Sequence, residues 1–279
     1  MLFILASMAT TFAQTDIIST EDFKAKLKDK EVVIIDASKN KLYKKAHVKN
    51  ALGIQYADLN IEGNDPNGLI QDANFIADYF GKLGINENTP VIIYDGGTQK
   101  YSSRMYFVLK YAGANNVMIT HKDDKFWAKN RIMLTAAAPK KRQATTFTAN
   151  PQNDMMVDLD YVMANKDNEN FVLVDNRTAE EFVGEKKVVD GKFGHIPGAI
   201  NIPYEEFETE SGAFKSKAQL EELAAKYGLT NDKQIIFHCK TGVKGAVAYI
   251  AFKNILGHPN VTVYDGGCAE FCTKYDLVK

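Results

Sequence analysis

Short apolar runs alternate with amphipathic segments along most of the chain. Six runs of four to seven residues predict strands, several of them apolar on both faces: 32–36, 90–95, 117–120, 171–175, 234–239 and 261–267. Four segments with apolar residues at helical spacing predict helices: 20–29, 74–84, 102–113 and 215–228. Doubly buried strands that alternate with helices indicate an α/β fold, a mainly parallel sheet with helices on both faces.

The same pattern occurs twice in the chain. Three polar or reactive positions recur in one order, so that Asp36, His47 and Asp95 of the first copy correspond to Asp175, His195 and Cys239 of the second. A polar and basic stretch at 136–154, with two prolines, separates the copies. We therefore predict two tandem domains of one fold, residues 15–138 and 152–279, with the linker at 139–151.

Composition narrows the class of protein. The 279 residues are 45% hydrophobic and 25% charged, which is typical of a soluble globular protein with two domains of average size. The formal net charge is −1, so no overall field recruits nucleic acid or an anionic membrane, and neither is an expected partner. Local charge must decide what binds.

The first residues, "MLFILASMATTFAQ", resemble an export signal. We predict a signal peptide at 1–13 and export to a compartment such as the periplasm, although no Lys or Arg precedes the apolar run. A buried first strand or helix is the alternative. No run is long enough to span a bilayer, so no membrane contact is expected after signal removal.

Three cysteines are too few for a disulfide framework. Cys268 and Cys272 are four residues apart without nearby histidines in sequence, which favours packing over a zinc site. We expect no metal and no organic cofactor. In an oxidising compartment Cys239 would stay free only if its site protects it.

The loop "HCKTGVKG" at 238–245 carries the candidate chemistry. Cys239 ends a predicted strand, where sites form in open parallel sheets. Gly242 and Gly245 allow a tight turn before a helix that starts near Gly245, and amides at a helix N-terminus bind anions. Such a cradle, with Lys240 and Lys244, favours a nucleophilic thiolate that attacks an anionic substrate. A buried, inert cysteine is the alternative.

Four motifs give the sequence a family resemblance: "DNRTAEEF", "GHIPGAINIP", "CKTGVKG" and "VTVYDGGCAEF". Together they resemble the rhodanese family of sulfurtransferases, and the duplication resembles its two-domain members. The resemblance implies two rhodanese-like domains. It also implies a persulfide on Cys239, held by the backbone of Lys240, Thr241, Gly242, Val243 and Lys244, and a thiol or cyanide as acceptor of the sulfur.

The first copy has "YDGGTQKYSSR" in place of the cysteine loop. A carboxylate at Asp95 cannot accept sulfane sulfur and opposes an anionic donor. We therefore expect the first domain to be catalytically silent and to wall one side of the cleft. A functional acid at Asp95 is the alternative.

The residues around the loop bear on the small-molecule sulfur donor. Lys240 resembles the thiosulfate-using members of the family, and Lys244 adds a second cation. Many members have an arginine where this chain has Glu181, which weakens the 3-mercaptopyruvate alternative without removing it. Arg177 is a candidate substrate contact, and the alternative is a structural pair with Asp175 or Glu181.

Three further positions have expected roles. Cys268 stands where the family usually has an aromatic residue, so we expect a wider site there. His195 and His238 are expected to be structural. A non-catalytic sulfur-carrier or binding module remains an alternative function. A cysteine phosphatase is disfavoured because the sixth position after Cys239 is Gly245 and not arginine.

Overall fold

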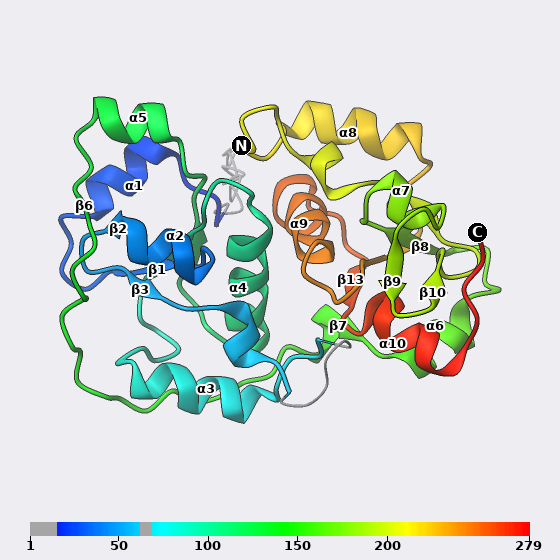
Figure 1. The fold of residues 1–279 in the computed structure, drawn as a ribbon, viewed down its shortest axis with the longest axis horizontal. Coiled ribbons are helices and arrows are strands. Elements are labelled where there is room, and N and C mark those ends of the chain that lie inside the picture. Colours follow the sequence, from blue (N-terminus) through cyan, green and yellow to red (C-terminus); the bar gives the residue numbers. More distant parts are fainter. Residues whose placement is uncertain (1–15, 62–67) are drawn as a thin grey trace, which may run out of the picture.

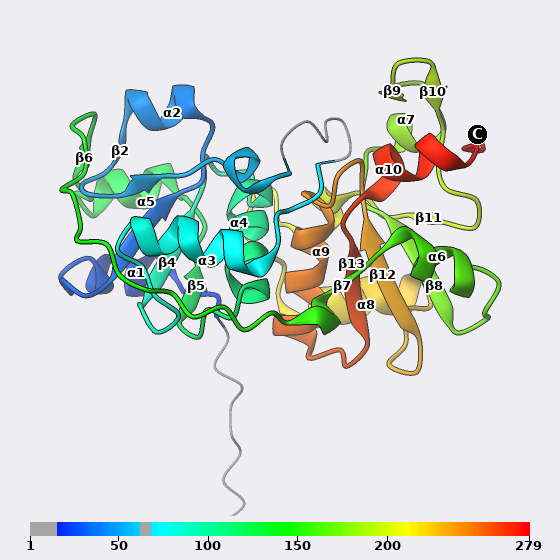
Figure 2. The same cartoon turned by 90° about the horizontal axis from the view of Figure 1, so that it is seen from below.

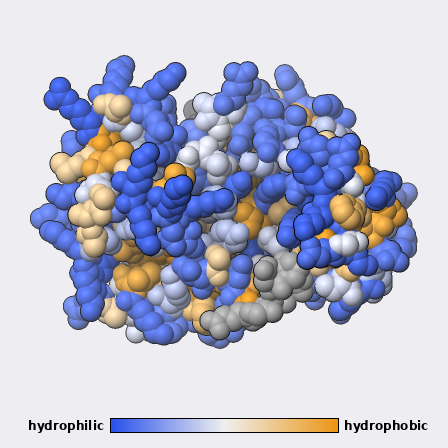
Figure 3. All heavy atoms as spheres, in the orientation of Figure 1, coloured by the Kyte–Doolittle hydropathy of each residue, from blue (hydrophilic) through white to orange (hydrophobic). Residues whose placement is uncertain are grey.

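The computed structural model describes residues 16–61 and 68–279, which form two α/β domains side by side (Figures 1 and 2). The predicted signal peptide at 1–13 lies outside these residues. On the face shown in Figure 3, hydrophilic residues cover most of both domains and hydrophobic residues appear in small separate patches. Within the described residues, no helix is both long and apolar enough to cross a membrane.

The first domain contains a four-stranded parallel sheet in the order β3-β1-β4-β5. Its strands are β1 (Val33–Asp36), β3 (Leu52–Gly53), β4 (Val91–Tyr94) and β5 (Val117–Ile119). A short antiparallel pair stands apart from it, β2 (His47–Val48) with β6 (Leu134–Thr135).

The second domain contains a five-stranded parallel sheet in the order β11-β8-β12-β13-β7. Its strands are β7 (Met156–Val157), β8 (Phe171–Asp175), β11 (Ile200–Asn201), β12 (Gln234–His238) and β13 (Val261–Tyr264). A separate hairpin pairs β9 (Lys187–Val189) with β10 (Lys192–Phe193). The order β11-β8-β12-β13 repeats the order β3-β1-β4-β5, which confirms that the same fold occurs in both halves of the chain.

Helices cover both faces of each sheet, as the apolar runs predict. In the first domain they are α1 (Thr20–Lys26), α2 (Asn40–Lys45), η1 (Tyr56–Leu59), α3 (Ala73–Lys82), α4 (Lys100–Tyr111) and α5 (Asp124–Lys129). In the second they are η2 (Asn153–Met155), α6 (Leu159–Asn165), α7 (Ala179–Phe182), η3 (Tyr204–Phe207), α8 (Lys217–Lys226), α9 (Gly245–Ile250), the π-helical turn η4 (Ala251–Leu256) and α10 (Gly267–Lys274).

The two domains meet through corresponding helices. α4 follows the Asp95 loop and α9 follows the Cys239 loop, and the two helices pack together. Phe107 and Tyr249 make an edge-to-face ring contact at 5.1 Å across this interface. One buried apolar cluster runs through both domains, so the interface is part of the core and not a loose hinge.

The segment at 139–151 contains no helix or strand and follows the surface of the first domain. The amide of Thr145 donates to the carbonyl of Gly81, and the side chain of Phe147 is buried in the core. The segment is thus packed against the first domain along its length.

Candidate active site

Cys239 lies directly after β12, at the carboxyl edge of the second sheet, and α9 begins six residues later. Its side chain is 2% exposed, and the backbone amide of Lys244 donates to Sγ over 3.3 Å. A thiolate accepts such a bond better than a thiol does, and the N-terminal end of a helix favours negative charge. The loop therefore directs a backbone donor and the start of a helix at this sulfur.

The start of α10 holds the Cys239 loop from behind. The carbonyl of Cys239 accepts from the amide of Cys268 over 2.9 Å, and the carbonyl of Lys240 accepts from the amide of Ala269 over 3.1 Å. Gly267 has a φ of +54°, and a side chain there would collide with the carbonyl oxygen of Cys239. Because the C=O and N–H of one trans peptide point in opposite directions, the amides of residues 240 and 241 face away from α10.

The amides of Thr241, Gly242 and Val243 in the second domain have no partner among the described residues, whereas their counterparts in the first domain do. Asp95 is fully buried, and its carboxylate accepts hydrogen bonds over 2.8–3.3 Å from the amides of Gly97, Thr98, Gln99, Tyr101 and Ser102 and from the Thr98 hydroxyl. Among residues 16–61 and 68–279, no acceptor meets the amides of Thr241, Gly242 and Val243. The same loop thus holds its own anion in one domain and is open to an external anion in the other.

This comparison adds to one expectation. The sequence analysis expected a silent first copy because a carboxylate replaces the cysteine, and the structure shows in addition that the anion cradle is present there and is filled by the Asp95 carboxylate. Because five amides and a hydroxyl already bind the carboxylate, the cradle has no room for a sulfur donor. Asp95 also has no sulfur that could act as a nucleophile. The geometry therefore gives a physical reason for a catalytically silent first domain.

The two lysines beside Cys239 have different surroundings. Lys240 is half-buried and forms no ion pair with the described part of the chain. Lys244 Nζ lies 2.7 Å from Glu181 Oε2, with the two side chains 20% and 21% exposed. Burial works against ionisation of Glu181, but the hydrogen bond and charge of Lys244 outweigh it and hold the pKa of Glu181 below its ordinary value.

The first domain contributes directly to the wall of this site. A side chain added at Gly68 would lie 2.7 Å from Thr241 Cβ, so the backbone of the first domain covers the loop closely there. Arg104 Nη1 lies 2.6 Å from Asp265 Oδ1, and both side chains are buried. This pair lies against Gly242, whose φ is +70° and whose added Cβ would lie 2.6 Å from Asp265 Oδ1.

A third lysine reaches the site from the first domain. Lys100 Nζ and Lys244 Nζ each lie 5.7 Å from the centre of the Tyr204 ring. The sequence analysis missed Lys100, although the duplication contained the signal. Lys100 stands five residues after Asp95, as Lys244 stands five residues after Cys239.

Arg177 is 1% exposed and belongs to the structural frame. Its Nε donates to the Asp175 carboxylate over 3.0 Å, and Nη2 donates to the carbonyl of Gly194 over 2.9 Å. These bonds tie the end of β8 to the turn before His195. The geometry supports the structural alternative for Arg177 and offers no support for a substrate contact.

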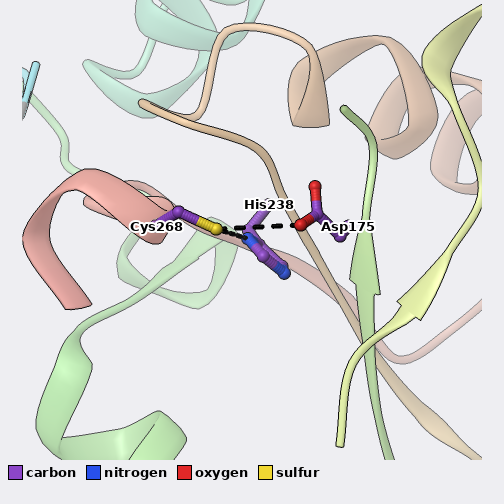
Figure 4. A group of neighbouring side chains, drawn as sticks. All are labelled: Asp175, His238 and Cys268. Atoms are coloured by element: carbon purple, nitrogen blue, oxygen red, sulfur yellow. Dashed lines mark hydrogen bonds between the residues drawn. The ribbon is translucent and has the colours of Figure 1, made fainter. Parts of the chain in front are cut away.

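Behind the Cys239 loop, Asp175, His238 and Cys268 form a buried cluster (Figure 4). Cys268 Sγ lies 3.7 Å from Asp175 Oδ2 and 3.8 Å from His238 Nδ1. Burial raises the pKa of the Cys268 thiol well above its ordinary value and lowers that of His238, so both groups are neutral at pH 7. The carboxylate is already bound by Arg177, so the cluster fits a hydrogen-bond network and not a cation site.

The cluster also corrects one expectation. Cys268 is fully buried in the core beneath the loop, beside Cys272, and not at the open face of the site. The smaller side chain therefore does not widen the site. The expected packing role of both cysteines is confirmed, and so is the structural role of His238.

His195 ties a turn, as predicted. Its Nδ1 lies 2.9 Å from the carbonyl of Phe182, and its ring stacks on the Phe182 ring at 3.7 Å between centroids. His47 does the same in the first domain, with Nδ1 2.8 Å from the carbonyl of Tyr43 and a stacked ring at 4.0 Å. The two histidines are equivalent structural positions of the duplicated fold.

Two parallel α/β domains of one topology, with a cysteine loop that is open in the second only, define a tandem α/β protein with one candidate nucleophile site. The sequence matches the rhodanese-like domain family over residues 19–129 and 158–274, and the chain belongs to this family. Its relatives are sulfurtransferases. The family resemblance and the fold class that the sequence predicted are thereby confirmed.

Individual relatives cover nearly the whole chain. The thiosulfate sulfurtransferase of Gallus gallus is 28% identical over 233 residues, which is 82% of this chain and 79% of that protein. The structure of SseA from Escherichia coli, described as a 3-mercaptopyruvate sulfotransferase, superposes with a TM-score of 0.81 at 26% identity and covers 91% of this chain and 98% of that one. The wild-type structure of EanB, at 20% identity, a TM-score of 0.82 and coverage of 95% and 70%, shares the fold.

Proposed function

We propose that this protein is a thiosulfate sulfurtransferase that carries a sulfane sulfur on Cys239 and passes it to a thiol or to cyanide. The observation that carries the proposal is the pair of equivalent loops. One loop holds the Asp95 carboxylate with six donors. The other presents Cys239, which accepts from the amide of Lys244, beside the amides of Thr241, Gly242 and Val243, which have no partner among the described residues. The outer sulfur of a Cys239 persulfide would be an anion about as far from the backbone as the carboxylate of Asp95 is.

The first step is attack on the donor. The Cys239 thiolate attacks the outer sulfur of thiosulfate, a new S–S bond forms at Cys239, and the S–S bond of thiosulfate breaks. Sulfite leaves with the electron pair of the broken bond. The amides of Thr241, Gly242 and Val243, together with that of Lys244, are available to stabilise the charge on the outer sulfur and on the leaving anion.

The second step returns the enzyme to its starting state. A thiolate or cyanide attacks the outer sulfur of the persulfide, and the Cys239 sulfur leaves as a thiolate. The products are an acceptor persulfide or thiocyanate. No external oxidant or reductant is needed, because each step breaks one bond to the transferred sulfur and forms another in its place.

The choice of thiosulfate rests on charge. Lys240 has no ion-pair partner in the described part of the chain, and Lys100 adds a cation from the first domain. Thiosulfate is a small dianion that gains from both. Glu181 stands where two-domain members of the family often have an arginine, and Arg177 is held by Asp175, which disfavours 3-mercaptopyruvate.

The similarity to the 3-mercaptopyruvate sulfotransferase SseA keeps that donor as the second candidate. Steady-state assays of the purified protein with each donor in turn, with cyanide as acceptor, separate the two. We expect the higher kcat/KM with thiosulfate. A higher value with 3-mercaptopyruvate would overturn the donor, and sulfur loading without turnover would favour a carrier module.

We further propose that the protein is exported, on the strength of the apolar segment at 1–13. Export calls for a protected nucleophile, and the low exposure of Cys239 meets that need. N-terminal sequencing of the protein recovered from each cell compartment tests this. An unprocessed N-terminus in the cytoplasmic fraction would contradict export.

A further inference from the structure

A cavity of about 490 Å³ lies in the first domain, away from the catalytic loop. Three segments that are far apart in sequence line it: the turn from α1 into β1, the turn after β2 and the start of the linker. Figures 1 and 2 show the α1–β1 turn and the chain after β6 on the side of the first domain that faces away from the second. The cavity is therefore distinct from the proposed active site.

The charge of this cavity is strongly one-sided. One carboxylate, that of Asp29, lines it together with seven cationic side chains: Lys26, Lys28, Lys30, Lys49, Lys140, Lys141 and Arg142. The ion pairs found among residues 16–61 and 68–279 include none of these seven. A solvated lysine face is the ordinary alternative, but here like charges from three segments converge on one hollow and raise its potential. The whole chain carries a net charge of only −1, so this concentration is local.

The floor of the cavity is apolar. Leu27 and Val32 are half-buried and line it, and Val33 and Ile34 also line it but are only 3% and 7% exposed. An inorganic ion gains no binding free energy from an apolar surface, whereas an organic group gains it by covering that surface. The combination of an apolar floor and a cationic rim selects a ligand with both kinds of surface.

Arg142 is the best-positioned cation of the rim. Its Nε donates to the carbonyl of Gly84, two residues after α3, over 3.3 Å, and the side chain is half-buried. This bond fixes the plane of the guanidinium while its two terminal nitrogens remain available. A planar fork held in this way suits the paired oxygens of a phosphate group.

We propose that this cavity binds a small organic molecule that carries two or more phosphate-type groups, such as a nucleoside diphosphate. The anionic groups meet the lysines and Arg142, and the organic part covers Leu27 and Val32. The volume lies within the range of about 300–1,000 Å³ that is usual for small-molecule sites. The site is independent of Cys239 and of the proposed sulfur transfer.

Isothermal titration calorimetry of the full chain tests the proposal, with ADP, pyrophosphate, adenosine and an oligoglutamate peptide as probes. We expect ADP to bind one site, several-fold tighter than pyrophosphate, with affinity that falls as salt rises. Lys28→Glu/Lys141→Glu should weaken ADP by at least about tenfold. The control Lys217→Glu/Lys274→Glu, with the same charge change in the second domain, should stay within about twofold.

The other outcomes overturn the proposal. No saturable binding of ADP, or equal loss in both double variants, would remove the site. Equal affinity for ADP and pyrophosphate would contradict the claim that the cavity binds the organic part of the ligand. Binding of the peptide without binding of ADP would assign the cavity to an acidic protein partner instead.

Discussion

Lys244 Nζ lies 2.7 Å from Glu181 Oε2, so the second cation beside Cys239 is neutralised by a carboxylate of its own domain. The sequence analysis treated the two residues separately, one as an aid to a dianionic donor and the other as a missing arginine. Together they form one electroneutral pair at the rim of the site. Lys240 and Lys100 then carry the positive charge that remains available there.

The pair leads to the first prediction. Glu181→Gln keeps an acceptor for the amide of Thr178 but removes the charge that holds Lys244. We expect kcat/KM for thiosulfate to rise about three- to tenfold, a gain of up to about 1.4 kcal/mol in transition-state stabilisation. Glu180→Gln, at an exposed neighbouring carboxylate, is the control and should leave the kinetics unchanged. A fall in kcat/KM specific to Glu181→Gln would mean that the pair positions Lys244 for catalysis.

The two lysines should differ in their effect on donor binding. Lys240→Ala removes an unpaired cation, so we expect the thiosulfate KM to rise about tenfold, with a dependence on salt that is weaker than in the wild type. Lys244→Ala removes a neutralised one and should raise the KM only about two- to threefold. Lys186→Ala serves as the surface control. Equal effects of the first two variants would refute the neutralised pair.

Arg104 and Asp265 should matter for stability because their ion pair is buried between the domains. Arg104→Met leaves the Asp265 carboxylate without its cation, and we expect the free energy of unfolding in urea to fall by about 3–5 kcal/mol. Lys82→Met breaks an ion pair of 2.5 Å whose side chains are 72% and 64% exposed, and should cost less than about 1 kcal/mol. Arg104→Met/Asp265→Asn should recover part of the loss, and no recovery would contradict the electrostatic cause.

Glu208 gives the stability a dependence on pH. Its side chain is 9% exposed at the domain interface, and burial, with the nearby charges of Asp95 and Glu205, raises its pKa from 4.5 to about 9. The unfolded chain loses this proton near its ordinary pKa and the folded protein keeps it, so stability is full below that value and declines as pH rises from 4.5 towards 9. Glu208→Gln should remove on the order of 2 kcal/mol of this decline between about pH 5.5 and 8.

Thermal unfolding across that range of pH measures the effect. Glu208→Gln should have the higher Tm at alkaline pH and should match the wild type at acidic pH. Glu206→Gln, an exposed carboxylate two residues away, should follow the wild type throughout. Parallel curves for Glu208→Gln and the wild type would contradict a protonated Glu208.

Much of the fold could be read from the sequence because doubly buried strands leave continuous apolar runs. β1, β4, β8, β12 and β13 all fall within runs such as 32–36 and 234–239, and the duplication supplied their order twice. His47 and His195 were also interpretable, because a local turn places each near its partner. Position in a local motif is what a sequence records well.

Contacts between distant segments could not be read in this way. Lys244 and Glu181 are 63 residues apart, and their pairing depends on where α7 and α9 meet. Arg104 and Asp265 belong to different domains, and no pattern within either domain specifies their contact. The hydrogen bonds to Asp95 could not be predicted for another reason. The sequence shows a carboxylate in place of the cysteine but does not show the amides that bind it.

The most direct test of the central proposal is the intact mass of the protein after incubation with thiosulfate. We expect one added sulfur atom per chain, located at Cys239 by peptide mapping, with release of an equal amount of sulfite. Cys239→Ser should gain no sulfur, and the buried Cys268 and Cys272 should remain unmodified. No added sulfur on protein that has been reduced beforehand and then freed of reductant and metal, or sulfur found on another cysteine, would contradict sulfur transfer through Cys239.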